Sequence, residues 1–199
     1  MNPGLTRNRI AAGGLAAILA CAAGTLLAQS KAPAKAPAPV RGESTEMLGA
    51  WNEIGNKLVT MAKDFPEAKY DFKVQKDQRT FAENLLHVAG VDYEMMATFP
   101  GAPKGPEGGE NPPRTTFKTK DDVVKLISQA VADGAALIKQ RGDAGMRTVV
   151  KYPFGSRMVH ASYVWYSCIE HSGEHYGQLV VYYRANDMVP PESRPRAGN

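Results

Sequence analysis

The sequence predicts an all-α fold, a four-helix bundle, for most of its 199 residues. Four segments repeat apolar residues at intervals of three and four, which is the spacing of one helix face. Stretches rich in glycine, proline and polar residues separate these segments, and no strand-rich block lies between them. Four amphipathic helices in a chain of this length can bury their apolar faces together as one bundle.

The first two helices are predicted over residues 44–64 and 79–98. In the first, one apolar face is followed by a closing Pro66. That face consists of Leu48, Trp51, Ile54, Leu58 and Met61. The second helix has an apolar stripe with His87 beside it, so His87 is expected to border the core. The stripe consists of Phe81, Leu85, Val88 and Met95.

Residues 100–116 contain many glycines and prolines and show no apolar periodicity, which predicts a long surface loop. Loops of this length are uncommon in compact domains unless they are functional or disordered. The third helix is expected to begin after Thr119, which suits an N-cap, and to end near Gly142. The β-branched segment 147–155 is expected to be extended and to lead into a fourth helix over residues 156–184.

Residues 1–28 have the pattern of an export signal peptide. Arg7 and Arg9 form a basic start, residues 10–27 carry no charge, and Ala28 is a small residue at the expected cleavage point. The pattern predicts a periplasmic or secreted protein. The uncharged run of 18 residues also approaches the ~20 that span a bilayer, so an uncleaved membrane anchor is an alternative.

Cys21 offers a third, weaker interpretation, as a lipid-attachment site. Residues 29–43 are rich in alanine and proline and are expected to form an extended linker. The folded domain is then expected over residues 44–194. Its size suits one domain with a sizeable core.

Charge and cysteine content argue against a nucleic-acid partner and against an intramolecular disulfide. Lysine and arginine outnumber acidic residues by 24 to 20, and removal of residues 1–28 lowers the net charge from +4 to +2. No basic cluster interleaved with aromatic residues remains, so a nucleic-acid partner is not expected. Cys168 would be the single remaining cysteine, which excludes an intramolecular disulfide. We expect it to be a small buried hydrophobic residue.

Three histidines are candidate metal ligands. His171 and His175 are four residues apart and lie about 40° apart on one helix face. His87, from the second helix, could join them by tertiary packing, and imidazole suits Zn, Ni, Cu and Fe. His160 is too far along the chain to share a first coordination shell with His171. The spacing alone is weakly specific, so hydrogen-bonded core histidines that bind nothing remain an equal alternative.

Glu174 is the candidate acid/base residue. The string HSGEH matches H-x-x-E-H, the inverted motif of some zinc proteases, in which the glutamate acts as general base. The rest of the sequence argues against a protease of that kind, since only Asp187 and Glu192 are acidic after His175. Glu174 therefore stands as a general acid/base candidate outside that class.

The C-terminal string HSGEHYGQLVVYYRANDMVPPESRP, with Trp51 and the segment NLLHVAG, resembles the DinB/YfiT-like superfamily over residues 45–194. The most specific part is the pattern H-x-x-x-H-x-G-Q, which ends at Gln178. The resemblance implies an up-down-down-up four-helix bundle that holds one divalent ion, commonly Ni or Zn. It also implies that His87, His171 and His175 are the ligands.

The resemblance and the three histidines together favour an exported metal-dependent hydrolase or transferase. Three protein ligands leave coordination positions open, which is typical of a catalytic site. The rival hypothesis is a non-catalytic metal-binding or stress-related interaction protein of the cell envelope. The expected partner is a small-molecule substrate, a homodimer is a further expectation, and a membrane would be contacted only through an uncleaved anchor.

Overall fold

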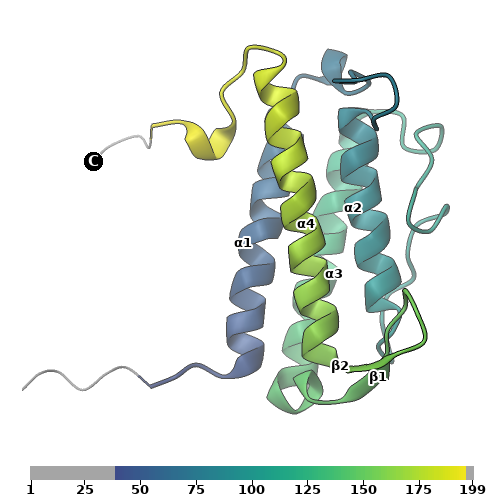
Figure 1. Ribbon diagram of the computed structural model, residues 1–199, viewed down its shortest axis with the longest axis vertical. Helices are drawn as coiled ribbons and strands as arrows, with labels where there is room; N and C mark the ends of the chain where they lie inside the picture. Colours follow the sequence, from purple (N-terminus) through teal and green to yellow (C-terminus); the bar gives the residue numbers. More distant parts are fainter. Residues whose placement is uncertain (1–38, 196–199) are drawn as a thin grey trace, which may run out of the picture. The chain divides into compact units, whose positions relative to one another are not determined.

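Four long helices pack side by side in the computed structural model, which describes residues 39–195 (Figure 1). They are α1 (Glu43–Asp64), α2 (Phe81–Met96), α3 (Lys120–Met146) and α4 (Ala161–Arg184). The predicted signal peptide and residues 29–38 of the predicted linker lie outside the described residues. Within residues 39–195, no helix combines the length and the apolar character needed to cross a membrane.

Short elements connect the helices. Two 3-10 turns, η1 (Glu67–Lys69) and η2 (Pro191–Ser193), follow α1 and α4. Two strands, β1 (Val149–Lys151) and β2 (Met158–His160), lie between α3 and α4 and form an antiparallel hairpin. The four-helix bundle predicted from the sequence is confirmed, and the hairpin is an addition to it.

Contacts at both ends of α1 show that α3 runs antiparallel to it. Near the start of α1, the Ser44 backbone N–H donates to Asp143 Oδ1 over 2.9 Å, close to the end of α3. Beyond the other end of α1, Lys120 Nζ donates to the Phe65 carbonyl oxygen over 2.8 Å, at the start of α3. The two helices are therefore aligned over nearly their whole length.

The fourth helix runs parallel to α1 and antiparallel to α2. Tyr183 OH, near the end of α4, donates to the Met61 carbonyl oxygen near the end of α1. Tyr182 OH lies 3.2 Å from Asn84 Nδ2, near the start of α2. The helix order is thus up-down-down-up, as the resemblance implies. Because α2 and α3 run in the same direction, the chain needs a long return connection, and residues 97–119 provide it along the side of the bundle (Figure 1).

The two tryptophans lie at the centre of the core. The Trp51 ring packs edge-to-face on Trp165, with centroids 5.5 Å apart, and its Nε1 donates to the Val131 carbonyl oxygen. A Cβ atom at Gly134 would lie 2.3 Å from the Trp51 ring, so glycine allows α3 to approach α1 at this point. Both indoles are fully buried.

Capping explains where the middle helices begin. Thr119 Oγ1 accepts from the Asp122 N–H, and Asp122 accepts from the Thr119 N–H, so the predicted N-cap is confirmed as a capping box. Thr80 and Glu83 form the same motif, which starts α2 two residues after the predicted position. Gly142, with φ of 58°, interrupts α3 near its predicted end, and the helix resumes as far as Met146.

The predicted start of the fourth helix was wrong. Residues 156–160 were expected to be helical, but Met158–His160 form β2 and α4 begins at Ala161. Val149, Val150 and Lys151 pair with His160, Val159 and Met158 respectively. Backbone hydrogen bonds to this partner strand satisfy groups that a helix would otherwise pair within itself. His160 is consequently the N-cap residue of α4 and is not part of the helix.

Candidate metal centre

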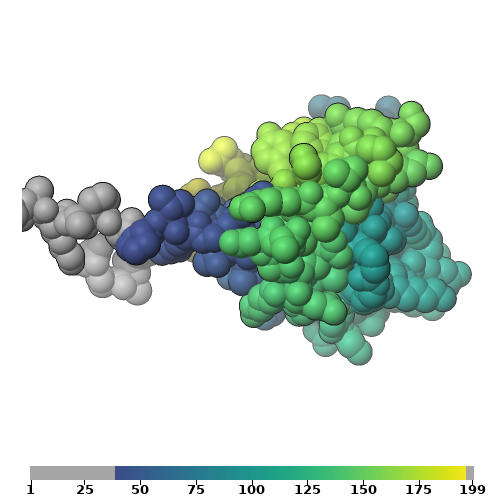
Figure 2. Space-filling view, turned by 90° about the horizontal axis from the view of Figure 1, so that it is seen from below, coloured from purple at the N-terminus to yellow at the C-terminus, as the bar shows by residue number. Residues whose placement is uncertain are grey.

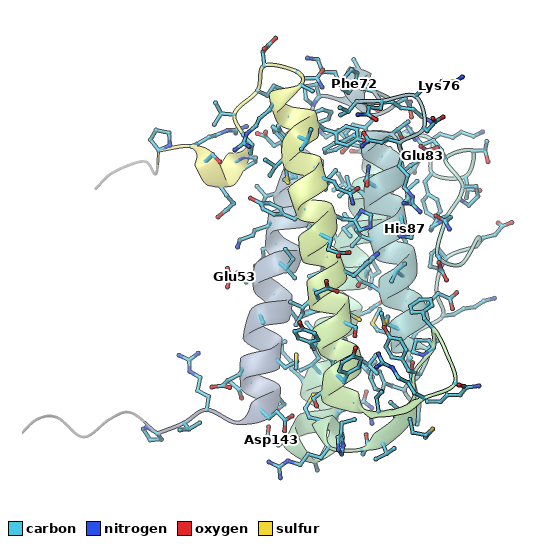
Figure 3. All side chains as sticks on the ribbon, viewed as in Figure 1. Glu53, Phe72, Lys76, Glu83, His87 and Asp143 are labelled. Atoms are coloured by element: carbon cyan, nitrogen blue, oxygen red, sulfur yellow. The ribbon has the colours of Figure 1, made fainter. Side chains whose placement is uncertain are left out.

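Helices α2 and α4 bring His87, His171 and His175 together. One nitrogen of each ring lies within 4.8 Å of one nitrogen of the other two. The Nε2 atoms of His87 and His171 are 3.3 Å apart, and the ring centroids of the three residues are 4.6 to 5.1 Å apart. His87 lies at mid-height of the bundle, on the helix that faces α4 (Figure 3). The three candidate ligands predicted from the sequence therefore form one cluster.

Hydrogen bonds fix the ring of His87. Its Nδ1 lies 2.9 Å from the Glu110 carbonyl oxygen and 3.1 Å from Asn111 Oδ1. A carbonyl oxygen can only accept, so Nδ1 carries the proton and the Nε2 lone pair is free. The free lone pair is on the side of the ring that faces His171.

Asn84 fixes the ring of His175 in the same way. Asn84 Nδ2 donates to the Thr80 carbonyl oxygen over 3.0 Å, which sets the orientation of the amide. Asn84 Oδ1 therefore faces His175 Nδ1 at 3.0 Å and accepts its proton. His175 is left with its Nε2 lone pair free, and both residues are buried.

His171 is the member of the cluster whose hydrogen bonding is incomplete. Its Nδ1 is buried, and none of the described residues forms a hydrogen bond with it. Its Nε2 faces the free lone pair of His87 at 3.3 Å. Because His87 Nε2 is unprotonated, this contact is favourable when His171 Nε2 carries a proton or when a cation lies between the two nitrogens. The donor set and its geometry therefore fit a bound cation.

Burial and mutual proximity keep the three imidazoles neutral. The pKa of His171 is lowered to about 4, mainly by burial and then by the neighbouring His87 and Arg79. Burial likewise lowers the pKa of His175 to about 3, with contributions from the other two histidines. The pKa of His87 is lowered mainly by burial and then by Arg79. Metal binding requires the neutral form, so the site is in its binding state near pH 7.

The long loop contributes to the site directly. Gly90 lies one turn after His87 on α2, and a Cβ there would lie 2.4 Å from the Gly109 carbonyl oxygen. Because glycine lacks that atom, the loop packs against α2 and places Glu110 and Asn111 on the His87 ring. The roles of Asn84, Glu110 and Asn111 are not predicted by the sequence patterns. Gly90, a glycine inside a helical pattern, was the available signal of a close backbone approach.

A cavity of about 340 Å³ opens beside the cluster, between α2, α4 and the hairpin. His87, His171, Glu110, Ser167 and Glu170 form its polar part. Its apolar part consists of Val91, Met95, Tyr152, Phe154, Tyr163 and Tyr166. The cluster thus has an open side that a small molecule could reach.

The remaining predicted residues lie outside this cavity. Glu174 is exposed on α4 and is not among the lining residues, whereas Glu170, one turn earlier, is. The acid/base role of Glu174 stays a prediction. Cys168 is a free, fully buried thiol, as expected. The imidazole of His160 lies 3.0 Å from the Arg147 carbonyl oxygen and is not part of the cluster.

Two solved structures are similar to this fold. A DinB-like protein from Bacillus cereus superposes with a TM-score of 0.64 at 16% identity, over 74% of this chain and 95% of that one. YfiT from Bacillus subtilis superposes with a TM-score of 0.56 at 12% identity, over 77% of this chain and 94% of that one. YfiT is described as a probable metal-dependent hydrolase with an unusual four-helix bundle topology.

Sequence comparisons give the family. No curated protein matches the chain. The family model of the DinB superfamily matches residues 50–179, which include α2 and all three clustered histidines. This match extends over well over half of the sequence. The chain therefore belongs to the DinB superfamily.

Proposed function

We propose that this protein is a metal-dependent hydrolase in which His87, His171 and His175 hold one divalent ion. The observation that carries the proposal is the convergence of three neutral imidazoles, two of which, those of His87 and His171, line an open cavity. Structural metal sites are usually closed by four protein ligands, whereas catalytic sites keep a position open for water or substrate. The structural neighbours are too distant in sequence to support more than the fold, so the activity is argued from the site itself.

The donor set indicates which ions fit. Three imidazole nitrogens without a carboxylate or thiolate suit Zn or Ni better than Mg or Ca, which prefer oxygen ligands. When bound, such an ion supplies Lewis-acid chemistry, polarising a carbonyl group and making water a better nucleophile near neutral pH.

The protein's own groups would orient and assist this chemistry. Asn84 and the Glu110 carbonyl oxygen hold two imidazoles in the tautomer that presents Nε2 to the ion. Glu170 lines the cavity next to His171, and its carboxylate could take a proton from an attacking water. The apolar walls limit the water around the substrate. We therefore propose Glu170 as general base, with Glu174 as the competing candidate from the sequence.

Hydrolysis of a panel of p-nitrophenyl esters tests the proposal. Turnover should disappear after chelation, return when Zn or Ni is added, and be absent in His175→Ala. Glu170→Gln should lower kcat by about 10²- to 10⁴-fold, while the same change at Glu174 decides between the two carboxylates. Turnover that survives in His175→Ala would refute the proposal. A loaded protein that turns over no ester would instead favour the non-catalytic alternative.

A further inference from the structure

Four aromatic side chains form a continuous cluster along the cavity, away from the histidines. Tyr152 and Phe154 come from the hairpin, and Tyr163 and Tyr166 come from the first turns of α4. Consecutive ring centroids are 6.0, 5.8 and 6.1 Å apart. Phe154 is 42% exposed and Tyr166 is 58% exposed, so their rings are open to a ligand.

The hairpin that carries two of these rings is fixed to α4. The Arg157 guanidinium lies 4.7 Å from the Tyr152 ring centroid and 4.6 Å from the Tyr163 ring centroid. It also donates a 2.7 Å hydrogen bond to Tyr163 OH. Strand pairing holds the base of the hairpin. Viewed from this end of the bundle, the hairpin and the start of α4, both green, lie together on the surface (Figure 2). The aromatic wall is therefore formed before any ligand binds.

The aromatic cluster and the histidines lie along one groove. Tyr163, Ser167 and His171 repeat every four residues on α4, so they share a face that extends about 12 Å at ~1.5 Å per residue. On the antiparallel α2, Val91 and Met95 follow His87 at the same interval and line the other side. The result is a slot with apolar walls whose inner end is the histidine cluster.

The charges around the slot restrict what it can bind. None of the described residues that line it is a lysine or arginine, whereas Glu110 and Glu170 are acidic, so an anionic group is disfavoured. The positive charge of Arg157 beside the Tyr152 and Tyr163 rings repels a second cation at these two rings. A neutral planar group that stacks against Phe154 and Tyr166 matches the remaining surface.

We propose that this slot selects substrates in which a neutral aromatic ring is attached to the group that reaches the metal. Phe154 and Tyr166 are the specificity-determining residues. This inference rests on the proposed metal site, because the histidines define the end of the slot at which the reacting group lies. Aromatic carboxylic esters or amides are therefore the substrate class that the site would take.

A pair of hydroxamate probes tests the proposal by binding alone. Benzohydroxamate and acetohydroxamate carry the same metal-binding group, but only the first has a ring. Their Kd values would be measured with the purified metal-loaded protein. We expect benzohydroxamate to bind at least about tenfold more tightly, in line with burial of a ring in an apolar slot.

Variants assign the effect to the slot. Phe154→Ala and Tyr166→Ala should each reduce the ratio of the two Kd values by roughly three- to tenfold, as expected for one aromatic contact, and leave acetohydroxamate binding unchanged. Tyr166→Phe keeps the ring and should keep the ratio. Tyr176→Ala is the matched control, because Tyr176 is on the same helix but does not line the cavity.

The possible results separate this inference from the proposed function. If both probes bind the wild type equally, or if neither alanine variant changes the ratio, the aromatic slot is refuted while the metal site stands. If neither probe binds the loaded wild-type protein, the proposed metal site is refuted and the inference with it. Thermal melts of Phe154→Ala and Tyr166→Ala check that the fold is retained, which the exposure of both rings leads us to expect.

Discussion

Replacement of Asn84 by leucine should weaken metal binding although Asn84 is not a ligand. Asn84 Oδ1 accepts the proton of His175 Nδ1, which keeps Nε2 free. Leucine has a similar volume, so it fills the site and excludes a substitute water, but it cannot accept a hydrogen bond. The His175 ring is then left with an unpaired buried N–H or turns to the other tautomer, in which Nε2 is protonated.

The loss of metal affinity and stability in Asn84→Leu should come from one broken contact, because the other partners of Asn84 keep hydrogen bonds. The Thr80 carbonyl oxygen still accepts from the residue 84 backbone N–H, and Tyr182 OH still donates to the Arg79 carbonyl oxygen. Only His175 loses its partner. Loss of such a partner lowers metal affinity by about 10- to 100-fold. An unsatisfied buried donor should also lower the unfolding free energy of the metal-free protein by about 1–3 kcal/mol.

Competition with a chromophoric chelator would give the Zn Kd, and thermal melts of the metal-free protein would give the stability. Asn111→Ala is the matched control, since Glu110 still holds the His87 Nδ1 proton in that variant, and its affinity should change by no more than about twofold. Wild-type affinity in Asn84→Leu, or an equal loss in Asn111→Ala, would refute the assignment of the His175 tautomer to Asn84.

Two further predictions concern stability. Arg194 forms a bidentate pair with Asp64 and holds the pKa of that carboxyl below its ordinary value of 3.8. The pair thus stabilises the fold above that pH, so Arg194→Ala should lower Tm at pH 7 by the equivalent of about 1 kcal/mol or less. The difference in Tm between the variant and the wild type should shrink below pH 3.8, where Asp64 becomes protonated. A difference that does not depend on pH would contradict this assignment. Gly134→Ala places a Cβ 2.3 Å from Trp51 and should cost about 1–3 kcal/mol. A Cβ atom at Gly49 would meet nothing within 4 Å, so Gly49→Ala should stabilise α1 by about 0.5–1 kcal/mol. Gly134→Ala should therefore lower Tm and Gly49→Ala should raise it, and shifts of the same sign in the two variants would argue against the packing described.

Local patterns explain why the sequence predicted the helices and the histidine cluster. The apolar stripes fix which side of each helix is buried, and the spacing of His171 and His175 puts both on one face whatever the tertiary structure. His87 beside the stripe of α2 then had only to face that pair across the bundle. Capping at Thr119 was equally local, because a threonine followed by acidic residues satisfies the first helical N–H groups itself.

The features that the sequence did not predict depend on contacts between distant segments. Met158–His160 have a composition that suits either a helix or a strand, and pairing with Val149–Lys151 decides the outcome. The roles of Glu110 and Asn111 depend on how closely the loop approaches α2 at Gly90. The hairpin also places the cavity toward the N-terminal end of α4, which is why Glu170 lines it and Glu174, one turn beyond, does not.

Metal content is the most direct test of the proposed site. The wild type, His87→Ala and His160→Ala would be purified without a histidine tag, reconstituted with Zn or Ni, dialysed and analysed by mass spectrometry. We expect about one equivalent of divalent metal in the wild type and in His160→Ala, and none in His87→Ala, because a single ion requires ligands from both α2 and α4. No bound metal in the wild type, or full retention in His87→Ala, would contradict the assignment of these three histidines to one metal site.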